Sequence, residues 1–406
     1  MQPRPNTSIT TPKEKRGHLP SWLLAGLCVI TLILTIALPY QIRAAGEPVV
    51  PMLIGDTLAP PLDKAVASHG SGQFATTPAV APTSIPSATA VYWGAYINGV
   101  PWDMTKLDAF ESMLGKRASI VHFGQPWQQG GQFLGFPTMV MDRVRARGSI
   151  PMINWGSWRF GYGADQPDYR LSVIAKGGYD NYIIAWARAA KAWGQPFFLK
   201  FDHEMNGWWQ FPWAEQRNGN QPGDYIKAWR HVHALFTQAG ATNVTWVWCP
   251  NIVGPSTTPL ASLYPGNAYV DWTCLHGYNV GGANWRTFTE IFRGYAGTPY
   301  DSYQQLLDLA PAKPIMLGEW ASAEARDGGA QKAAWIRDAL EQQIPNNFPR
   351  IRAVVWYNRN NTPDRTWVVE SSSPSIQAFA EAIASPYYTH NQFATLGISP
   401  IPPPER

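Results

Sequence analysis

The feature that most constrains the fold is a repeated alternation, between Ala90 and Ser385, of short apolar runs with amphipathic stretches. The apolar runs predict strands at 91–97, 118–124, 149–156, 196–204, 243–251, 269–278, 313–320 and 352–358. Helical periodicity separates many of them, for example over 180–194, 223–240 and 330–344. Near-continuous apolar strands that alternate with helices indicate a parallel sheet covered by helices.

Eight such strands within residues 91–385 fit a (β/α)8 barrel, an α/β architecture that typically needs about 250 residues. An open doubly wound sheet is the alternative. No glycine-rich phosphate loop follows any of the strands, which argues against a nucleotide-binding version of that sheet. We therefore predict a (β/α)8 TIM barrel over 91–385.

The N-terminal region contains a long apolar run, because residues 22–38 include no charged residue and no proline. A helix of this length nearly spans a hydrocarbon core of about 30 Å. Lys13, Lys15 and Arg16 precede it, and this positive charge predicts that residues 1–20 stay in the cytoplasm. We expect a transmembrane anchor over 21–40. The alternative is a secretory signal, removed with residues 1–45, for which Ala44 and Ala45 offer a poor cleavage site.

Two further segments lack a sustained hydrophobic period. Residues 41–90 are rich in Pro, Ala, Ser and Thr, so we expect a disordered linker between the anchor and the barrel. The tail over 386–406 is expected to be irregular. Whether residues 1–45 anchor the chain or are cleaved, the barrel is expected outside the cytoplasm, membrane-anchored or secreted.

The composition excludes some classes of protein and favours others. A net charge of +4 on 406 residues is too weak to indicate a nucleic-acid partner. Three cysteines cannot form a disulfide framework. Cys249 and Cys274 lie on neighbouring predicted strands, where they could form one disulfide or remain two buried thiols. The chain has 20 Trp, 17 Tyr and 16 Phe, and side chains this large fill a sizeable core or line a groove for a flat-faced ligand.

The reactive groups of such barrels lie at the C-terminal ends of the strands. Here the fourth strand ends in FDHEMNGWW, with Glu204, and the seventh ends in GEWAS, with Glu319. Strands four and seven lie across the barrel mouth from each other, so the two carboxylates can converge. Glycosidic cleavage requires such a pair, one protonated and one ionised. Alternatively, Glu204 pairs with Lys200, and Glu319 caps the helix that follows.

The stretch His203-Glu204-Met205-Asn206-Gly207 resembles the acid/base motif of glycoside hydrolase family 26, the β-mannanase family of a large clan of retaining barrel enzymes. The position of the motif on the fourth strand also matches. The resemblance covers the barrel, about residues 91–385, and implies that Glu204 is the general acid/base. It implies that Glu319, in the sequence LGEW of the seventh strand, is the nucleophile.

The same resemblance implies four substrate contacts and no cofactor. His203 would position the sugar and the acid, and Tyr278 would hydrogen-bond the nucleophile. Trp356 would form the floor of the −1 subsite, and His122 would make another contact there.

The chain departs from the family pattern at Lys200, where Arg is frequent, and at Asp202, where an apolar residue is common. We expect these inward polar groups to pair beneath the site. His122, His203 and His276 lie near strand ends, but no HxH or HExxH element supports a metal site, and we predict none.

Aromatic residues surround the predicted site and indicate what kind of substrate it binds. Trp158, Trp208 and Trp209 are expected to stack on sugar rings, with local core packing as the alternative. We therefore predict a monomeric, retaining endo-β-glycanase, acting on β-1,4-mannan by double displacement. The alternatives are a β-1,3-1,4-glucanase or β-1,3-xylanase, a non-catalytic glycan-binding protein of the cell surface, and an accessory protein of exopolysaccharide synthesis.

Overall fold

The computed structural model describes residues 90–207, 211–360 and 366–405. Eight parallel strands pair in the order β1-β9-β8-β7-β6-β5-β4-β2, and β1 also pairs with β2, which closes the predicted barrel. The barrel strands are β1 (Val91–Ile97), β2 (Ile120–Gln129), β4 (Ile150–Arg159), β5 (Phe197–Phe201), β6 (Val244–Trp248), β7 (Trp272–Asn279), β8 (Ile315–Ser322) and β9 (Ile351–Asn358). The short β3 (Gln132–Phe133) and β10 (Tyr388–Thr389) extend the sheet beyond the barrel.

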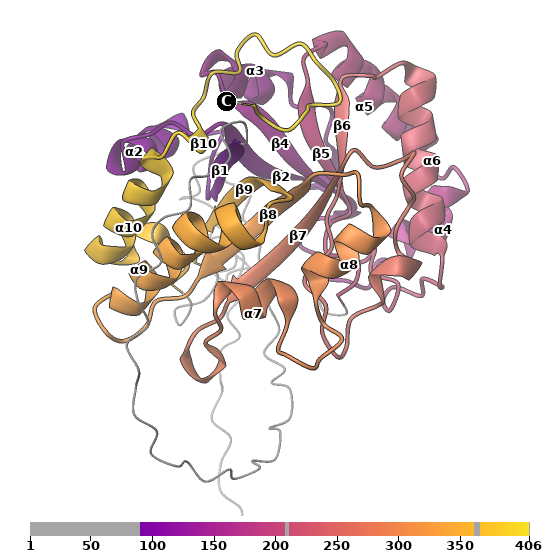
Figure 1. The fold of residues 1–406 in the computed structure, drawn as a ribbon. Coiled ribbons are helices and arrows are strands. Elements are labelled where there is room, and N and C mark those ends of the chain that lie inside the picture. Colours follow the sequence, from indigo (N-terminus) through magenta and orange to yellow (C-terminus); the bar gives the residue numbers. More distant parts are fainter. Residues whose placement is uncertain (1–89, 208–210, 361–365, 406) are drawn as a thin grey trace, which may run out of the picture. The chain divides into compact units, whose positions relative to one another are not determined.

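Helices cover the outside of the barrel, as Figure 1 shows. They are α2 (Met104–Leu114), α3 (Thr138–Ala146), α4 (Leu171–Ala175), α5 (Asp180–Trp193), α6 (Asp224–Ala239), α7 (Phe288–Arg293), α8 (Ser302–Leu309), α9 (Ala330–Arg337) and α10 (Ser373–Ala384). A π-helical segment, Asp338–Asn347, continues α9, and short 3-10 turns lie at Pro167–Tyr169, Leu260–Ser262, Gly282–Asn284 and Val369–Ser371. Of the helices predicted from periodicity, α5 and α6 end at the expected residues because Gly194 and Gly240 adopt a left-handed conformation there.

Side chains of the barrel strands alternate between two apolar cores. One core fills the barrel interior with residues such as Ile120, Met152, Phe198 and Val355. The larger core lies between the strands and the helices. The alternation follows from the two-residue period of a strand, and it decides which residues of each strand end can reach the barrel mouth.

The C-terminal tail closes the barrel end where the strands begin (yellow in Figure 1). Ile401 is buried within the interior core. Its carbonyl accepts a hydrogen bond from Trp272 Nε1 (2.8 Å), and its N–H donates to Thr245 Oγ1 (2.8 Å). No named helix or strand follows β10 in the described part of the tail, and the tail packs as part of the domain.

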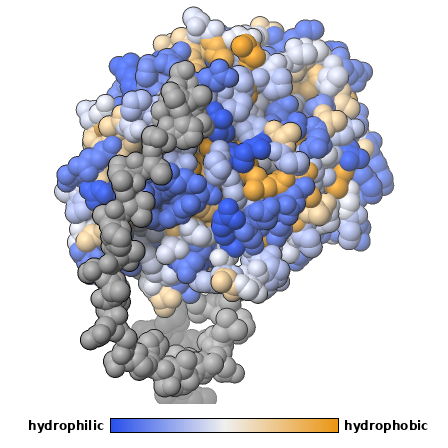
Figure 2. Space-filling model, viewed as in Figure 1, coloured by the Kyte–Doolittle hydropathy of each residue, from blue (hydrophilic) through white to orange (hydrophobic). Residues whose placement is uncertain are grey.

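The predicted anchor (21–40) lies outside the described residues, as does the predicted linker (41–90) up to Thr89. Among the helices of the described ranges, none combines the length and the apolar character needed to span a membrane. On the face drawn in Figure 2, hydrophilic residues cover most of the surface and apolar residues form small patches among them. This distribution is ordinary for a domain whose large apolar side chains are inside.

Candidate active site

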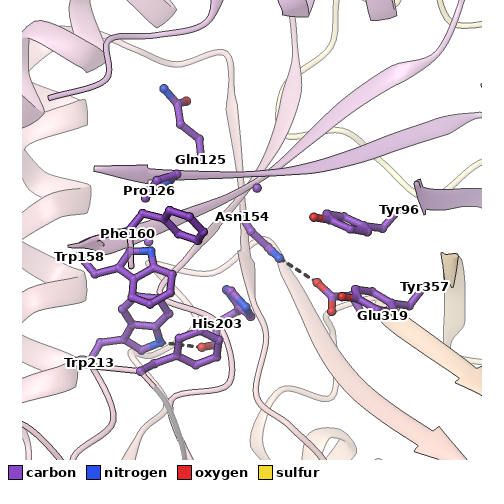
Figure 3. A pocket seen from close by; sticks show the side chains of 13 residues that line it. Tyr96, Gln125, Pro126, Asn154, Trp158, Phe160, His203, Trp213, Glu319 and Tyr357 are labelled. Atoms are coloured by element: carbon purple, nitrogen blue, oxygen red, sulfur yellow. Dashed lines mark hydrogen bonds between the residues drawn. The ribbon is translucent and has the colours of Figure 1, made fainter. Parts of the chain in front are cut away.

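A cavity of about 520 Å³, including its opening to solvent, lies at the C-terminal ends of the barrel strands. Figure 3 shows aromatic side chains on one side and Glu319 with two tyrosines on the other. The lining residues are Tyr96, Gly124, Gln125, Pro126, Asn154, Gly156, Trp158, Phe160, His203, Phe211, Trp213, Glu319 and Tyr357.

The aromatic side of the cavity is built from the end of β4 and the loop after β5. The rings of Phe211 and Trp213 stack with their centres 4.5 Å apart. Trp158 meets both edge-on at 5.8 Å. Trp213 Nε1 donates to the His203 carbonyl (2.6 Å), which ties this wall to the predicted acid/base motif. Trp158 therefore lies where a sugar ring in the cavity could contact it.

The carboxylate of Glu319 lies at the cavity edge and accepts two short hydrogen bonds. Asn154 Nδ2 donates to Oε1 (2.8 Å), and the Tyr278 hydroxyl donates to Oε2 (2.7 Å), which is the contact expected for Tyr278. The ammonium of Lys200 lies 3.7 Å from Oε1. Each of these three groups places a hydrogen-bond donor or a positive charge against the carboxylate.

A β-bulge in β8 aims Glu319 into the barrel. Leu275 of β7 pairs with Leu317, but the next residue, His276, pairs with Glu319, so Gly318 is the extra residue. A Cβ at position 318 would lie 2.4 Å from Cys274 Sγ, so only glycine fits there without displacing its neighbours. Cys274 forms a disulfide with Cys249, so of the two states considered from the sequence the pair is a disulfide and not two buried thiols.

Glu204 lies in the turn that follows β5, because this strand ends at Phe201 and not at the predicted residue 204. Its backbone has a φ of 55°, and its N–H donates to the Cys249 carbonyl (2.8 Å). Such left-handed backbone is uncommon outside glycine and concentrates at functional sites. The Glu204 carboxylate is 1% exposed and does not line the cavity.

Glu204 and Glu319 nevertheless converge. One carboxylate oxygen of each residue and one ring nitrogen of His276 all lie within 4.8 Å of one another. The closest contact is 2.7 Å, between His276 Nδ1 and Glu204 Oε1. Two carboxylates and an imidazole could hold a cation, but the Lys200 ammonium 3.7 Å from Glu319 opposes binding of a second positive charge. We assign no metal here.

The expected pairing of Lys200 with Asp202 is wrong. Lys200 Nζ lies 3.1 Å from His276 Nε2 and beside Glu319, whereas Asp202 accepts bonds from Ser157 N and Ser157 Oγ, both 2.7 Å. Because the turn begins at Asp202, its side chain no longer shares a face with Lys200. Burial lowers the pKa of Lys200 to about 8 and raises the pKa of Asp202 to about 8.

Two expected substrate contacts are corrected. Trp356 packs against Trp320 and Phe379 in the layer between strands and helices, because the two-residue period of β9 turns it away from the mouth. Its neighbour Tyr357 lines the cavity instead. His122 is fully buried behind Glu319, its Nε2 3.8 Å from Oε1, so it does not line the cavity.

The remaining predicted residues divide between the cavity and the undescribed part of the chain. His203 lines the cavity, with its ring 4.9 Å from that of Phe211. Trp208 and Trp209 lie outside the described residues. Tyr96, Asn154 and Tyr357 also line the cavity and were not predicted from the sequence. Each shares its strand face with an interior core residue, namely Tyr92 four positions before Tyr96, Met152 two before Asn154 and Val355 two before Tyr357, so the alternation could have indicated them.

Comparison with known proteins points to one family. The model for glycosyl hydrolase family 26 matches residues 121–313, which include Glu204 and end before Glu319. Endoglucanase H of Acetivibrio thermocellus is 34% identical over 304 residues, 72% of this chain and 30% of that protein. Beta-1,3-xylanase TXYA of a Vibrio species is 28% identical over 123 residues, 29% of this chain and 24% of that protein. The chain thus spans less than a third of the length of these relatives.

Among solved structures, the Bacillus subtilis mannanase BCman superposes with a TM-score of 0.51, covering 75% of this chain and 87% of that one. Its sequence identity of 17% shows the shared fold alone. The family match, the Endoglucanase H relative and the closed parallel barrel agree with one another, and the barrel of this chain belongs to glycosyl hydrolase family 26.

Proposed function

We propose that this domain is a retaining endo-β-glycanase in which Glu319 is the nucleophile and Glu204 the general acid/base. The observation that carries the proposal is the approach of one oxygen of each carboxylate to within 4.8 Å at the mouth of the barrel, beside an aromatic-walled cavity. Retaining enzymes hold their two carboxyl groups about 5–5.5 Å apart, whereas inverting enzymes leave about 6.5–9.5 Å for a water molecule.

The different surroundings of the two carboxylates support these roles. Glu319, held as an anion by Asn154, Tyr278 and Lys200, attacks the anomeric carbon and forms a covalent glycosyl-enzyme. Glu204 protonates the departing glycosidic oxygen. It then takes a proton from the water that releases the sugar, so both carboxyl groups return to their starting states.

The cavity residues would hold the sugar for this reaction. His203 and Trp158 line the cavity opposite Glu319, where they would contact the sugar ring bound at the point of cleavage. Glu204 lies behind this surface, so its carboxyl group would reach the glycosidic oxygen through the oxygen that does not contact His276. Stacking by Trp208 and Trp209 stays a prediction of the sequence.

Two polysaccharide backbones are candidates for the substrate. The HEMNG motif resembles that of the β-mannanase family and favours β-1,4-mannan. The relative at 34% identity is named an endoglucanase, which favours a β-glucan. A β-1,3-xylan is a weaker candidate, because the xylanase match covers only 29% of this chain.

The test is release of reducing ends from galactomannan, mixed-linkage β-glucan and β-1,3-xylan. We expect the wild-type protein to cleave at least one of them, and Glu204→Gln and Glu319→Ala to lose this cleavage while their melting temperatures change little. Glu381→Gln, an exposed carboxylate on α10, is the matched control and should retain full activity. Substantial turnover by both site variants would contradict the assignment. Binding of a glycan by the wild-type protein without new ends would identify a binding module.

We also propose, from the sequence, that the protein acts outside the cytoplasm as a monomer tethered by residues 21–40. Fractionation of expressing cells tests the tether: the full chain should sediment with membranes, and a chain starting at residue 90 should not.

A further inference from the structure

A buried row of three side chains runs beneath the cavity from β5 through β7 to the turn after β5. Lys200 Nζ lies 3.1 Å from His276 Nε2, and His276 Nδ1 lies 2.7 Å from Glu204 Oε1. Lys200 and His276 are fully buried, and Glu204 is 1% exposed. The mechanism proposed above uses Glu204 and Lys200 but gives no task to His276.

The two neighbours of His276 determine which of its nitrogens carries the proton. Lys200 is an ammonium donor and has no lone pair, so Nε2 must be the acceptor of that contact. Burial, with the positive charge of Lys200, lowers the pKa of His276 to about 3, so its ring is neutral under ordinary conditions. A neutral imidazole has one N–H, which is therefore on Nδ1 and donates to Glu204 Oε1.

This contact leaves the two oxygens of Glu204 with different tasks. Oε1 accepts the hydrogen bond from His276 Nδ1–H, so Oε1 cannot carry a proton that points toward the same nitrogen. In the protonated acid the proton therefore resides on Oε2, and that oxygen has to face the glycosidic bond. When Glu204 has given up its proton, the same Nδ1–H bond stabilises the carboxylate that acts as base.

We infer that His276, held as its Nδ1–H tautomer by Lys200, is a positioning residue that orients Glu204 as the general acid/base. The inference rests on the proposed function and assigns no proton transfer to His276 itself. The packing around the ring supports a fixed orientation. Glu319 Oε2 lies 3.7 Å from Nδ1, the His203 ring is 5.5 Å away, and the Cys249–Cys274 disulfide and Gly318 close the remaining side.

The experiment compares two leaving groups in each variant. A sugar hydroxyl leaving from a polysaccharide needs a proton from the acid, whereas dinitrophenolate leaves without one. The substrates are the polysaccharide that the wild-type protein cleaves fastest and the dinitrophenyl β-glycoside of the matching disaccharide, cellobiose or mannobiose. The readout is kcat/KM, because it reports the first, acid-dependent step for the polysaccharide.

We expect His276→Leu to lower kcat/KM on the polysaccharide by roughly ten-fold or more, and by no more than the ~10²–10⁴-fold that general acid–base catalysis contributes. On the dinitrophenyl glycoside the loss should stay below about three-fold. The ratio of the two values does not depend on the fraction of folded enzyme, so partial misfolding does not obscure the result. His276→Asn places an amide donor where Nδ1 lies and should restore much of the ratio.

His233→Asn serves as the control, because this histidine lies on α6 against Trp246 and Tyr269, and its ratio should equal that of the wild-type protein. Equal losses on both substrates in His276→Leu would overturn the inference alone, since His276 would then only support the fold. If the wild-type protein cleaves no β-glycan, the proposed function fails, and the inference fails with it.

Discussion

At the scale of the residue, the site contains two glutamates of the same intrinsic chemistry in different surroundings. Glu319 accepts bonds from an amide and a phenol and lies beside an ammonium group. Glu204 accepts a bond from a neutral imidazole. The proposed reaction requires such different surroundings, because its two carboxyl groups have different roles.

Tyr278→Phe tests the support of Glu319 directly. The variant keeps the ring, which stacks on Trp367 at 4.6 Å, and removes only the hydroxyl that donates to Oε2. A hydrogen bond to a charged group contributes about 1.5–3 kcal/mol, so kcat on the cleaved polysaccharide should fall about 10- to 100-fold. Tyr264→Phe removes a hydroxyl that donates to Asn267, and neither residue lines the cavity, so this control should leave kcat unchanged. An unchanged kcat in Tyr278→Phe would contradict the nucleophile assignment.

Asp202→Asn should change how stability depends on pH. Burial raises the pKa of Asp202 from 3.8 to about 8. Between these values the folded protein keeps a proton that the unfolded chain has lost, so this group lowers the free energy of unfolding as pH rises, by up to about 1.4 kcal/mol per unit. An asparagine can make both bonds to Ser157 without ionising, so the variant should gain stability relative to wild type, on the order of 1 kcal/mol or more, between about pH 5 and pH 8.

Urea unfolding at the two pH values measures this difference. Asp308→Asn, at an exposed position of α8, should show the same pH dependence as the wild-type protein. Parallel curves for Asp202→Asn and wild type would show that Asp202 is ionised in the folded protein throughout this range.

For single strands, the sequence predicts where each strand lies but not where a strand bulges or ends early. Eight apolar runs predicted the eight barrel strands, and the first matches β1 residue for residue. The placement of Glu204 and Glu319 at strand ends followed from those runs and from the HEMNG motif. The bulge at Gly318 and the early end of β5 could not be predicted, because both depend on contacts between strands. The family resemblance placed Trp356 in the −1 subsite, but its neighbour Val355 belongs to the interior core, so the alternation along β9 turns Trp356 to the outer face.

Gly318→Ala tests the bulge. The added Cβ would lie 2.4 Å from Cys274 Sγ and 3.1 Å from Cys249 Sγ, and a disulfide cannot move aside as a flexible side chain can. We expect a loss of about 1–3 kcal/mol in the free energy of unfolding, and lower activity because Glu319 shifts with the strand. Gly254→Ala, where a Cβ meets no atom within 4 Å, is the control. Wild-type stability and activity in Gly318→Ala would show that the bulge accommodates a side chain.

At the scale of the whole molecule, the barrel has one end that carries the cavity and one end that is closed by the tail. The tail contributes Ile401 to the interior core, and the Arg352 guanidinium donates to the Pro404 carbonyl. Its composition predicted irregular structure but not packing, because the contacts come from strands far away in the sequence. The tail therefore belongs to the folding unit.

Ile401→Ala should lower the free energy of unfolding by about 2–5 kcal/mol, since it removes a fully buried side chain from the barrel end. Thermal unfolding followed by circular dichroism measures the change. Ile398→Ala, three residues earlier and 62% exposed, should unfold like the wild-type protein. Equal melting temperatures for the two variants would mean that the tail contributes no stability to the barrel.

The tail also brings the first and the last residues of the described barrel domain close together. Arg352 Nε donates to the Ala90 carbonyl (2.9 Å), and the same guanidinium binds the carbonyl of Pro404. Both points therefore lie on the side of the domain remote from the cavity. A domain immobilised on beads through either of these points would present its cavity to the surrounding solution.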